Sequence, residues 1–221
     1  MTTKLDKRLS NKIVLDTETT LEQHVNDIAW TISNKNGNIV YKRYLIKETS
    51  ENETPFAPTK REYYKNLVDN HELPVVSIEF AISDLINDSI KYNAKMYAYN
   101  SKFDFDKIND TLKAYNSDLQ LTENVIDIWA LSYNTIIQQK SYVRFVRDNN
   151  LFTDKHNPKM SAESVYKYIS DNVDFEEDHT ALSDTIIETE ILWRALAQHK
   201  KRNYQTPYWL DFKKYYESVI D

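Results

Sequence analysis

Two acidic residues at the end of a predicted strand have the types and the spacing for metal chemistry. Asp16 and Glu18 follow directly on the apolar run Ile13-Val14-Leu15. Side chains two residues apart on a strand point to the same face, so we expect these carboxylates to project together. Like charges at this spacing raise each other's pKa and cost stability if they are desolvated. The alternative to a metal site is a strand that has simply emerged into solvent.

A second acidic position lies in a segment whose apolar spacing predicts a long amphipathic helix over 180–199. Asp184 falls in the apolar stripe, three residues after Ala181 and three before Ile187. A carboxylate on the apolar face of a helix is rare unless it is paired or binds a metal, the alternative being a place at the edge of the stripe. His179 precedes Asp184 by five residues, about 140° on one continuous helix. The two can therefore meet only if His179 lies in the loop before the helix.

A third acidic group follows the predicted strand at 94–99. Asp104 and Asp106 fall in the first turn of a predicted helix or just before it. Acids at a helix N-terminus are favoured by capping and by the helix dipole, which is the simple alternative to a ligand role. Asp104 and Asp106 therefore indicate a metal site only in combination with the other two acidic positions.

The elements that must position these residues alternate between strands and helices. Three successive antiparallel strands are expected first, because Asn36-Gly37 is a strong two-residue hairpin signal between the second and third. The order of strands and helices after them predicts an α/β fold with a mixed sheet. The strands are expected over 12–18, 27–34, 38–46, 94–99 and 124–128. The helices are expected over 59–70, 75–92, 104–116, 129–137, 141–150, 161–171 and 180–199, with a last one after Pro207.

Composition narrows the possible functions. The chain has 221 residues, of which 41% are hydrophobic, enough for one packed domain. Its formal net charge of −6 disfavours a protein that coats nucleic acid, but it allows an enzyme that grips a strand end. Gly37 is the single glycine, so a P-loop, a Rossmann fingerprint and a nucleophile elbow are ruled out. The lack of cysteine rules out disulfides and thiolate metal sites.

The sequence carries no sign of a membrane or a secretory route. No apolar stretch approaches the roughly 20 residues that a membrane helix needs. The N-terminal segment MTTKLDKRLSNK is polar and has no apolar signal core. We therefore expect a cytoplasmic protein with no membrane partner, in the host cytoplasm if the chain is viral.

Three segments, "LDTETT", "YNSKFDFD" and "HTALSD", occur in this order. They resemble the three exonuclease motifs of the DEDDh 3′-5′ exonucleases, the proofreading branch of the ribonuclease H-like superfamily. The resemblance spans about residues 12–199 and implies a ribonuclease H-like α/β fold. Its five-stranded mixed sheet has three antiparallel strands, then two parallel ones, flanked by helices. The matching residues are Asp16 and Glu18, then Asn100, Phe103 and Asp104, then His179, Ala181 and Asp184.

The match departs from the family pattern at two positions. Tyr99 stands where the family often has a histidine before the second-motif asparagine, and Leu21 stands where a glycine is common. Neither position is a metal ligand in the family pattern. A sister class has a tyrosine four residues before the last aspartate, where this chain has Thr180, so the histidine class is favoured.

The resemblance implies a mechanism and a substrate. Four carboxylates suit two Mg²⁺ or Mn²⁺ ions, which can clamp an in-line phosphoryl displacement. His179 would take the proton of the attacking water, and nucleoside monophosphates would leave from the 3′ end of single-stranded DNA or RNA. The implied catalytic residues are Asp16, Glu18, Asp104, His179 and Asp184, of which the four carboxylates are the metal ligands. The implied substrate-binding residues are Thr17, Thr19, Asn100 and Phe103.

The expected organisation is one exonuclease domain over 1–199 with a basic and aromatic extension over 200–221, a helix packed on the same domain. A replication or repair protein is a possible partner. Two alternatives remain open at this point. One is a catalytically weak module that binds nucleic acid or protein on the same fold. The other is a metal-dependent phosphodiesterase that acts on internal bonds or short nucleotides.

Overall fold

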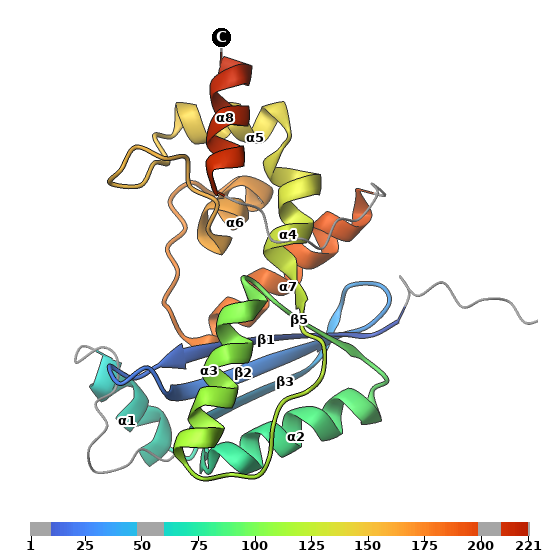
Figure 1. The fold of residues 1–221 in the computed structure, drawn as a ribbon, viewed down its shortest axis with the longest axis vertical. Coiled ribbons are helices and arrows are strands. Elements are labelled where there is room, and N and C mark those ends of the chain that lie inside the picture. The colour runs from blue at the N-terminus through green and yellow to red at the C-terminus, as the bar shows by residue number, and fades with distance from the viewer. Residues whose placement is uncertain (1–9, 48–59, 199–208, 221) are drawn as a thin grey trace, which may run out of the picture.

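The chain folds around a mixed six-stranded sheet in a computed structural model that describes residues 10–47, 60–198 and 209–220 (Figure 1). The strands are β1 (Lys12–Thr19), β2 (Val25–Ser33), β3 (Ile39–Lys47), β4 (Val75–Val76), β5 (Lys95–Ala98) and β6 (Ile126–Asp127). Their order across the sheet is β4-β3-β2-β1-β5-β6. The first three pair antiparallel, whereas β5 runs parallel to β1, β6 to β5 and β4 to β3.

The predicted fold is confirmed, with one strand more than the five expected. The additional strand, β4, has two residues and pairs with the end of β3 at the sheet edge. The apolar pattern placed Val75 and Val76 in the helix that follows, because a two-residue strand is too short to show an alternation of its own. The strand expected over 124–128 is likewise reduced to two residues, Ile126 and Asp127.

The described helices correspond to those that the apolar spacing predicted, with shifted ends. The helix expected from residue 104 begins at Ser101, directly after Asn100 in the left-handed conformation (φ +60°). The helix expected over 129–137 is divided into a short α-helix and a π-helical turn, η3 (Tyr133–Ile137). The α-helices are α1 (Arg61–Asp69), α2 (Ile78–Lys91), α3 (Ser101–Ala114), α4 (Ile128–Ser132), α5 (Lys140–Asp148), α6 (Ala162–Ser170), α7 (Ala181–Ala197) and α8 (Trp209–Ile220).

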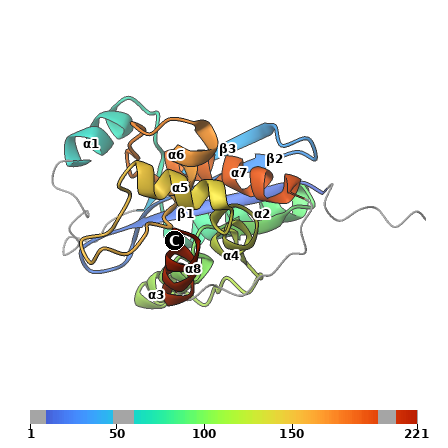
Figure 2. The same cartoon turned by 90° about the horizontal axis from the view of Figure 1, so that it is seen from above.

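Strand β1 lies inside the sheet and contributes to an apolar core on each face. Ile13 and Leu15 are fully buried in a cluster with side chains of α2 and α3, whereas Val14 is fully buried with side chains of α4 to α8. Figure 1 shows α2 below the strands and α4, α5, α6 and α8 above them, and Figure 2 gives the view from above. The run Ile13-Val14-Leu15 is apolar without alternation because both of its faces are covered.

The hairpin that Asn36-Gly37 predicted joins β2 and β3, but its loop is longer than a two-residue turn, because the backbone N–H of Asn34 donates to the backbone oxygen of Asn38 (2.9 Å). Gly37 has a φ of +86°, which glycine adopts without steric cost. The side-chain oxygen of Asn34 accepts hydrogen bonds from the backbone N–H groups of Asn36 (2.9 Å) and Asn38 (3.2 Å). This turn brings β3 back antiparallel along β2.

Helix α8 packs on the α4–α7 side of the same fold. Phe212 is fully buried, with its ring against Tyr133 and Tyr142. The hydroxyl of Tyr215 donates to the backbone oxygen of Gln138 (2.6 Å). Residues 200–208 of the expected basic extension lie outside the described residues. Among the described helices, none is long and apolar enough to span a bilayer.

Candidate active site

The first two carboxylates lie at the C-terminal end of strand β1, inside the sheet. Asp16 and Glu18 are half-buried and share the face of Val14, which is the face that α7 covers. The register between β1 and β2 shifts directly after Glu18, where the pairing passes from Glu18–Asp27 to Thr19–Val25. The carboxylates therefore stand where the ordered pairing of the strand ends, between the sheet and a helix, and not in open solvent.

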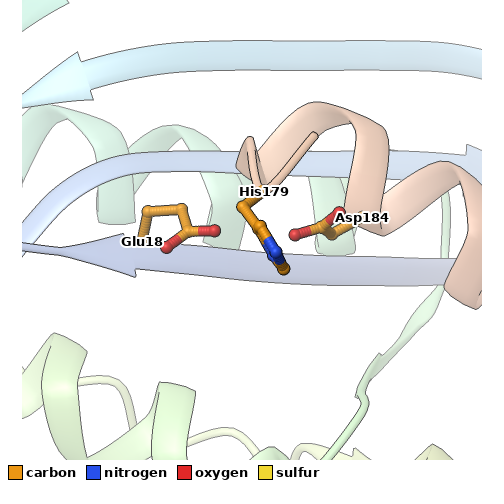
Figure 3. Close-up of side chains that lie close together, drawn as sticks. All are labelled: Glu18, His179 and Asp184. Atoms are coloured by element: carbon orange, nitrogen blue, oxygen red, sulfur yellow. The ribbon is translucent and has the colours of Figure 1, made fainter. Parts of the chain in front are cut away.

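The start of α7 brings a histidine and a third carboxylate to the same place (Figure 3). Thr180 is the N-cap, and its hydroxyl accepts from the backbone N–H of Ser183. His179 is in the loop before the cap with a left-handed φ of +52°, and Asp184 is in the first turn. One ligand atom each of Glu18, His179 and Asp184 lies within 4.8 Å of the others. The loop position is the condition under which His179 and Asp184 were expected to meet.

Helix α3 supplies the fourth carboxylate. Asp104 is 1% exposed in the first turn, and its Oδ1 accepts two hydrogen bonds from Thr17, one from the backbone N–H (3.0 Å) and one from the hydroxyl (2.9 Å). These bonds tie the start of α3 to β1 between Asp16 and Glu18. Asp106, the neighbouring acid, instead forms an exposed ion pair with Lys102. The structure thus separates the two acids that sequence spacing had left in competition.

The carboxylates lie close enough together to disturb one another's titration. Burial raises the pKa of Asp16 well above its usual range, and the negative charge of Asp104 adds to the rise. Burial also raises the pKa of Glu18 to about 8, that of Asp104 to about 7 and that of Asp184 to about 6. Carboxyl groups held in this way are neutralised either by protons or by cations.

The donor set fits a hard divalent cation. Asp16 Oδ2 is buried and has no hydrogen-bond partner in the described part of the chain. A buried oxygen without a donor costs free energy unless some ligand satisfies it. Carboxylate oxygens are the ligands that Mg²⁺ and Mn²⁺ prefer. Asp16, Glu18 and Asp184, with Asp104 beside them, therefore have the chemistry to hold such ions.

Solved structures share this arrangement of elements. The nuclease domain of 3′hExo bound to rAMP, described as a DEDDh family member, matches with a TM-score of 0.60 and 13% identity, over 90% of this chain and 98% of that chain. The fold is that of the DEDDh exonucleases. A product-bound exonuclease I matches with a TM-score of 0.53 and 13% identity, over 85% of this chain and 45% of that chain. No protein-family model and no curated protein matches the sequence.

A moderately thermophilic exonuclease I from Methylocaldum szegediense has the same fold, with a TM-score of 0.53 and 14% identity. The match covers 86% of this chain and 41% of that chain. The chain thus spans less than half the length of either exonuclease I, and nearly the whole length of the 3′hExo nuclease domain. What the three share with this chain is the fold.

The residues expected to contact substrate divide into two pairs in this DEDDh exonuclease fold. Thr17 and Thr19 are buried, and the Thr17 hydroxyl is already bonded to Asp104. Asn100 and Phe103 are exposed at the start of α3, and Phe103 is 41% exposed. Asn100 and Phe103 thus have side chains that solvent can reach, whereas Thr17 positions a carboxylate.

Sequence reasoning missed a fifth carboxylate in the cluster. Glu188 is 4% exposed on α7, one turn after Asp184, and its Oε2 accepts the backbone N–H of Tyr99 (3.1 Å). Its charge is among those that raise the pKa of Asp16. Residues four apart lie on one face of a helix, so a second acid in the apolar stripe was the available signal. No motif of the family pattern covers this position.

A buried aspartate on the sheet holds the start of α7, next to the loop that carries His179. Asp27 on β2 is fully buried and accepts hydrogen bonds from the hydroxyls of Tyr44 (3.0 Å) and Tyr64 (3.1 Å) and from the backbone N–H of Ala181 (3.3 Å). Ala181 is the first residue of α7, so these bonds fix the start of that helix on the sheet. Lys60, next to α1, donates to the backbone oxygen of His179. The loop is therefore held from two sides.

Proposed function

We propose that the chain is a divalent-metal-dependent 3′-to-5′ exonuclease that releases nucleoside monophosphates from single-stranded DNA or RNA. The observation that carries the proposal is the meeting of Glu18, His179 and Asp184 within 4.8 Å, beside Asp16 and Asp104. The similarity to solved DEDDh exonucleases supports the choice of reaction, at low sequence identity. Soluble single strands with a free 3′ end are the substrate class.

The carboxylates and the histidine of the site have different roles in the proposed reaction. Asp16, Glu18, Asp104 and Asp184 would hold two Mg²⁺ or Mn²⁺ ions, which when bound supply an acidified water and neutralise charge on the phosphate. His179 takes the proton of the attacking water, since histidine is the side chain that most readily exchanges a proton near neutral pH. The water oxygen bonds to phosphorus, the bond from phosphorus to the 3′ oxygen breaks, and that oxygen receives a proton from solvent.

The anchoring of the loop is what makes His179 suitable as the base. Its side chain is exposed and stands on the solvent side of Glu18 and Asp184, where a water can reach it. Glu177 Oε2 lies 3.7 Å from His179 Nδ1, and when ionised it attracts the imidazolium that forms on proton transfer, although burial raises the pKa of Glu177 to about 8. The hydrogen bonds of Asp27 and Lys60 restrict the loop, so the base stays within reach of the reacting water.

The test is release of mononucleotides from a 5′-labelled oligonucleotide in Mg²⁺ or Mn²⁺. A ladder that shortens from the 3′ end and stops on addition of EDTA is expected, and Asp184→Asn is expected to abolish it while the protein stays folded. Intact substrate in both metals contradicts the proposal. Cleavage of a circular single strand would indicate a phosphodiesterase for internal bonds, and end binding without cleavage a binding module. Matched DNA and RNA oligonucleotides decide the preferred sugar.

A further inference from the structure

A cavity of about 550 Å³ lies between the end of β5 and the loop that leads into α6. Its lining includes Tyr99 and Asn100 from the strand end, Trp129 from α4, and Pro158, Lys159 and Met160 from the loop. This volume falls in the range of about 300–1,000 Å³ that is typical of small-molecule sites. No residue of the carboxylate cluster lines it, so the cavity is a separate feature of the surface.

The cavity is nonetheless joined to the candidate active site by backbone hydrogen bonds. The N–H of Tyr99 donates to Glu188 (3.1 Å), and the N–H of Asn100 donates to Asp127 Oδ1 (3.2 Å). The same Asp127 oxygen caps α4 by accepting from the N–H of Trp129 (2.8 Å). Asn100 also precedes α3, whose first turn holds Asp104. The cavity and the carboxylate cluster therefore share the end of β5 and the start of α3.

The walls of the cavity are fixed in place by hydrogen bonds. The hydroxyl of Tyr99 donates to the backbone oxygen of Met160 (2.5 Å), and that of Tyr142 donates to the backbone oxygen of Lys159 (3.0 Å). The loop closes on itself through the N–H of Thr153 and the backbone oxygen of Asn157 (2.8 Å). A cavity with walls held from both sides can select an occupant by shape.

The chemistry of the walls suits a planar aromatic ring. Tyr99 and Trp129 offer aromatic faces, Pro158 and Met160 add apolar surface, and Asn100 adds an amide. The indole N–H of Trp129 is buried and has no hydrogen-bond partner among the described residues, so only packing holds this ring. Nucleobases stack on aromatic side chains, and an amide such as that of Asn100 can donate to and accept from their edges.

We infer that this cavity receives one base of the single strand, on the 5′ side of the nucleotide that is cleaved. The inference rests on the proposed function, because it assumes that the 3′ end lies at the carboxylates. A base inside a duplex is stacked and paired and cannot enter, so the occupant is an unpaired base. Lys159, also in the lining, offers a cation to the neighbouring phosphates.

The experiment is a scan of abasic residues along a fluorescent oligonucleotide. The dissociation constant for the folded wild-type protein is measured by anisotropy in Ca²⁺, with one base removed at each position in turn from the 3′ end. We expect an increase of about tenfold at one internal position, since stacking on an aromatic side chain contributes about 1–3 kcal/mol per base. A flat profile, or a loss only at the terminal base, overturns the inference. Hydrolysis of the same oligonucleotides in Mg²⁺ tests the proposed function separately.

Three variants assign the effect to the cavity. Trp129→Leu should weaken binding of the intact strand about tenfold and abolish the penalty of the internal abasic residue, whereas Trp129→Phe should keep most of both. Trp193→Leu is the matched control, because Trp193 is a half-buried tryptophan that bonds Ser33 Oγ (2.7 Å) and lies outside the cavity lining. Equal loss of binding in Trp193→Leu and Trp129→Leu, at equal thermal stability, would contradict the assignment.

Discussion

The carboxylate of Glu18 gives the most direct test of the electrostatics of this site. Burial, followed by repulsion from Asp27 and Asp184, raises its pKa from 4.5 to about 8. A carboxyl group with a raised pKa in the folded state favours folding while it is protonated. Its contribution is complete below pH 4.5 and is lost as the pH rises through about 8. At about 1.4 kcal/mol for each pKa unit, the ceiling for this loss is about 5 kcal/mol.

Glu18→Gln removes the charge and keeps the shape of the side chain. In EDTA at high pH we expect the variant to be more stable than the wild type by about 2–4 kcal/mol, below the ceiling because water screens a half-buried group. At pH 4.5, where wild-type Glu18 is protonated in the fold, the two proteins should differ by less than about 1 kcal/mol. In Mg²⁺ at high pH we expect the wild type to be the more stable of the two proteins. The ion stabilises the folded wild type by binding to the Glu18 carboxylate, which the variant lacks.

The assay is urea unfolding followed by far-UV circular dichroism, at low and high pH, with EDTA or Mg²⁺. Glu190→Gln is the matched control, because Glu190 is an exposed carboxylate on α7 and its removal should leave the pH dependence unchanged. A Glu18→Gln protein that is less stable than the wild type by the same amount at both pH values would refute the reasoning. That result would mean that the charge of Glu18 is not disfavoured by the fold.

Three further outcomes follow from the contacts around the site. Thr17→Val should lower the unfolding free energy by about 1.5–3 kcal/mol, measured in urea, because a buried Asp104 oxygen loses a charged hydrogen bond. Tyr64→Phe removes one donor to Asp27 and should cost a similar amount, and it should also slow nucleotide release because the start of α7 is less firmly held. His179→Ala should slow single-turnover release by about 10²–10⁴ while the metal-induced rise in melting temperature persists. Unchanged turnover would remove the base role.

Local sequence patterns accounted for most of the scaffold. The spacing of Asn36-Gly37 between apolar runs predicted the β2–β3 hairpin, and the two strands pair antiparallel, although the loop between them closes at Asn34 and Asn38 and not as a two-residue turn. The stripe of α7 was predicted from Ala181 and Ile187, both of which are buried. These patterns work because hairpins and amphipathic helices are set by neighbours in the sequence. Strand β4 escaped them because its two residues are strand only by pairing with β3.

The sequence by itself determined that acidic residues occur at the positions where the site needs carboxylates. It also excluded glycine-rich nucleotide-binding motifs, because the chain has one glycine, and thiolate metal sites, because it has no cysteine. Tertiary structure alone decided that Asp104 faces the site while Asp106 faces solvent, and that Glu188 adds a fifth charge. It also decided that Asp27 anchors the start of α7. The physical reason is that burial and charge proximity depend on segments far apart in the chain. The energy of a carboxylate is therefore fixed only when those segments meet.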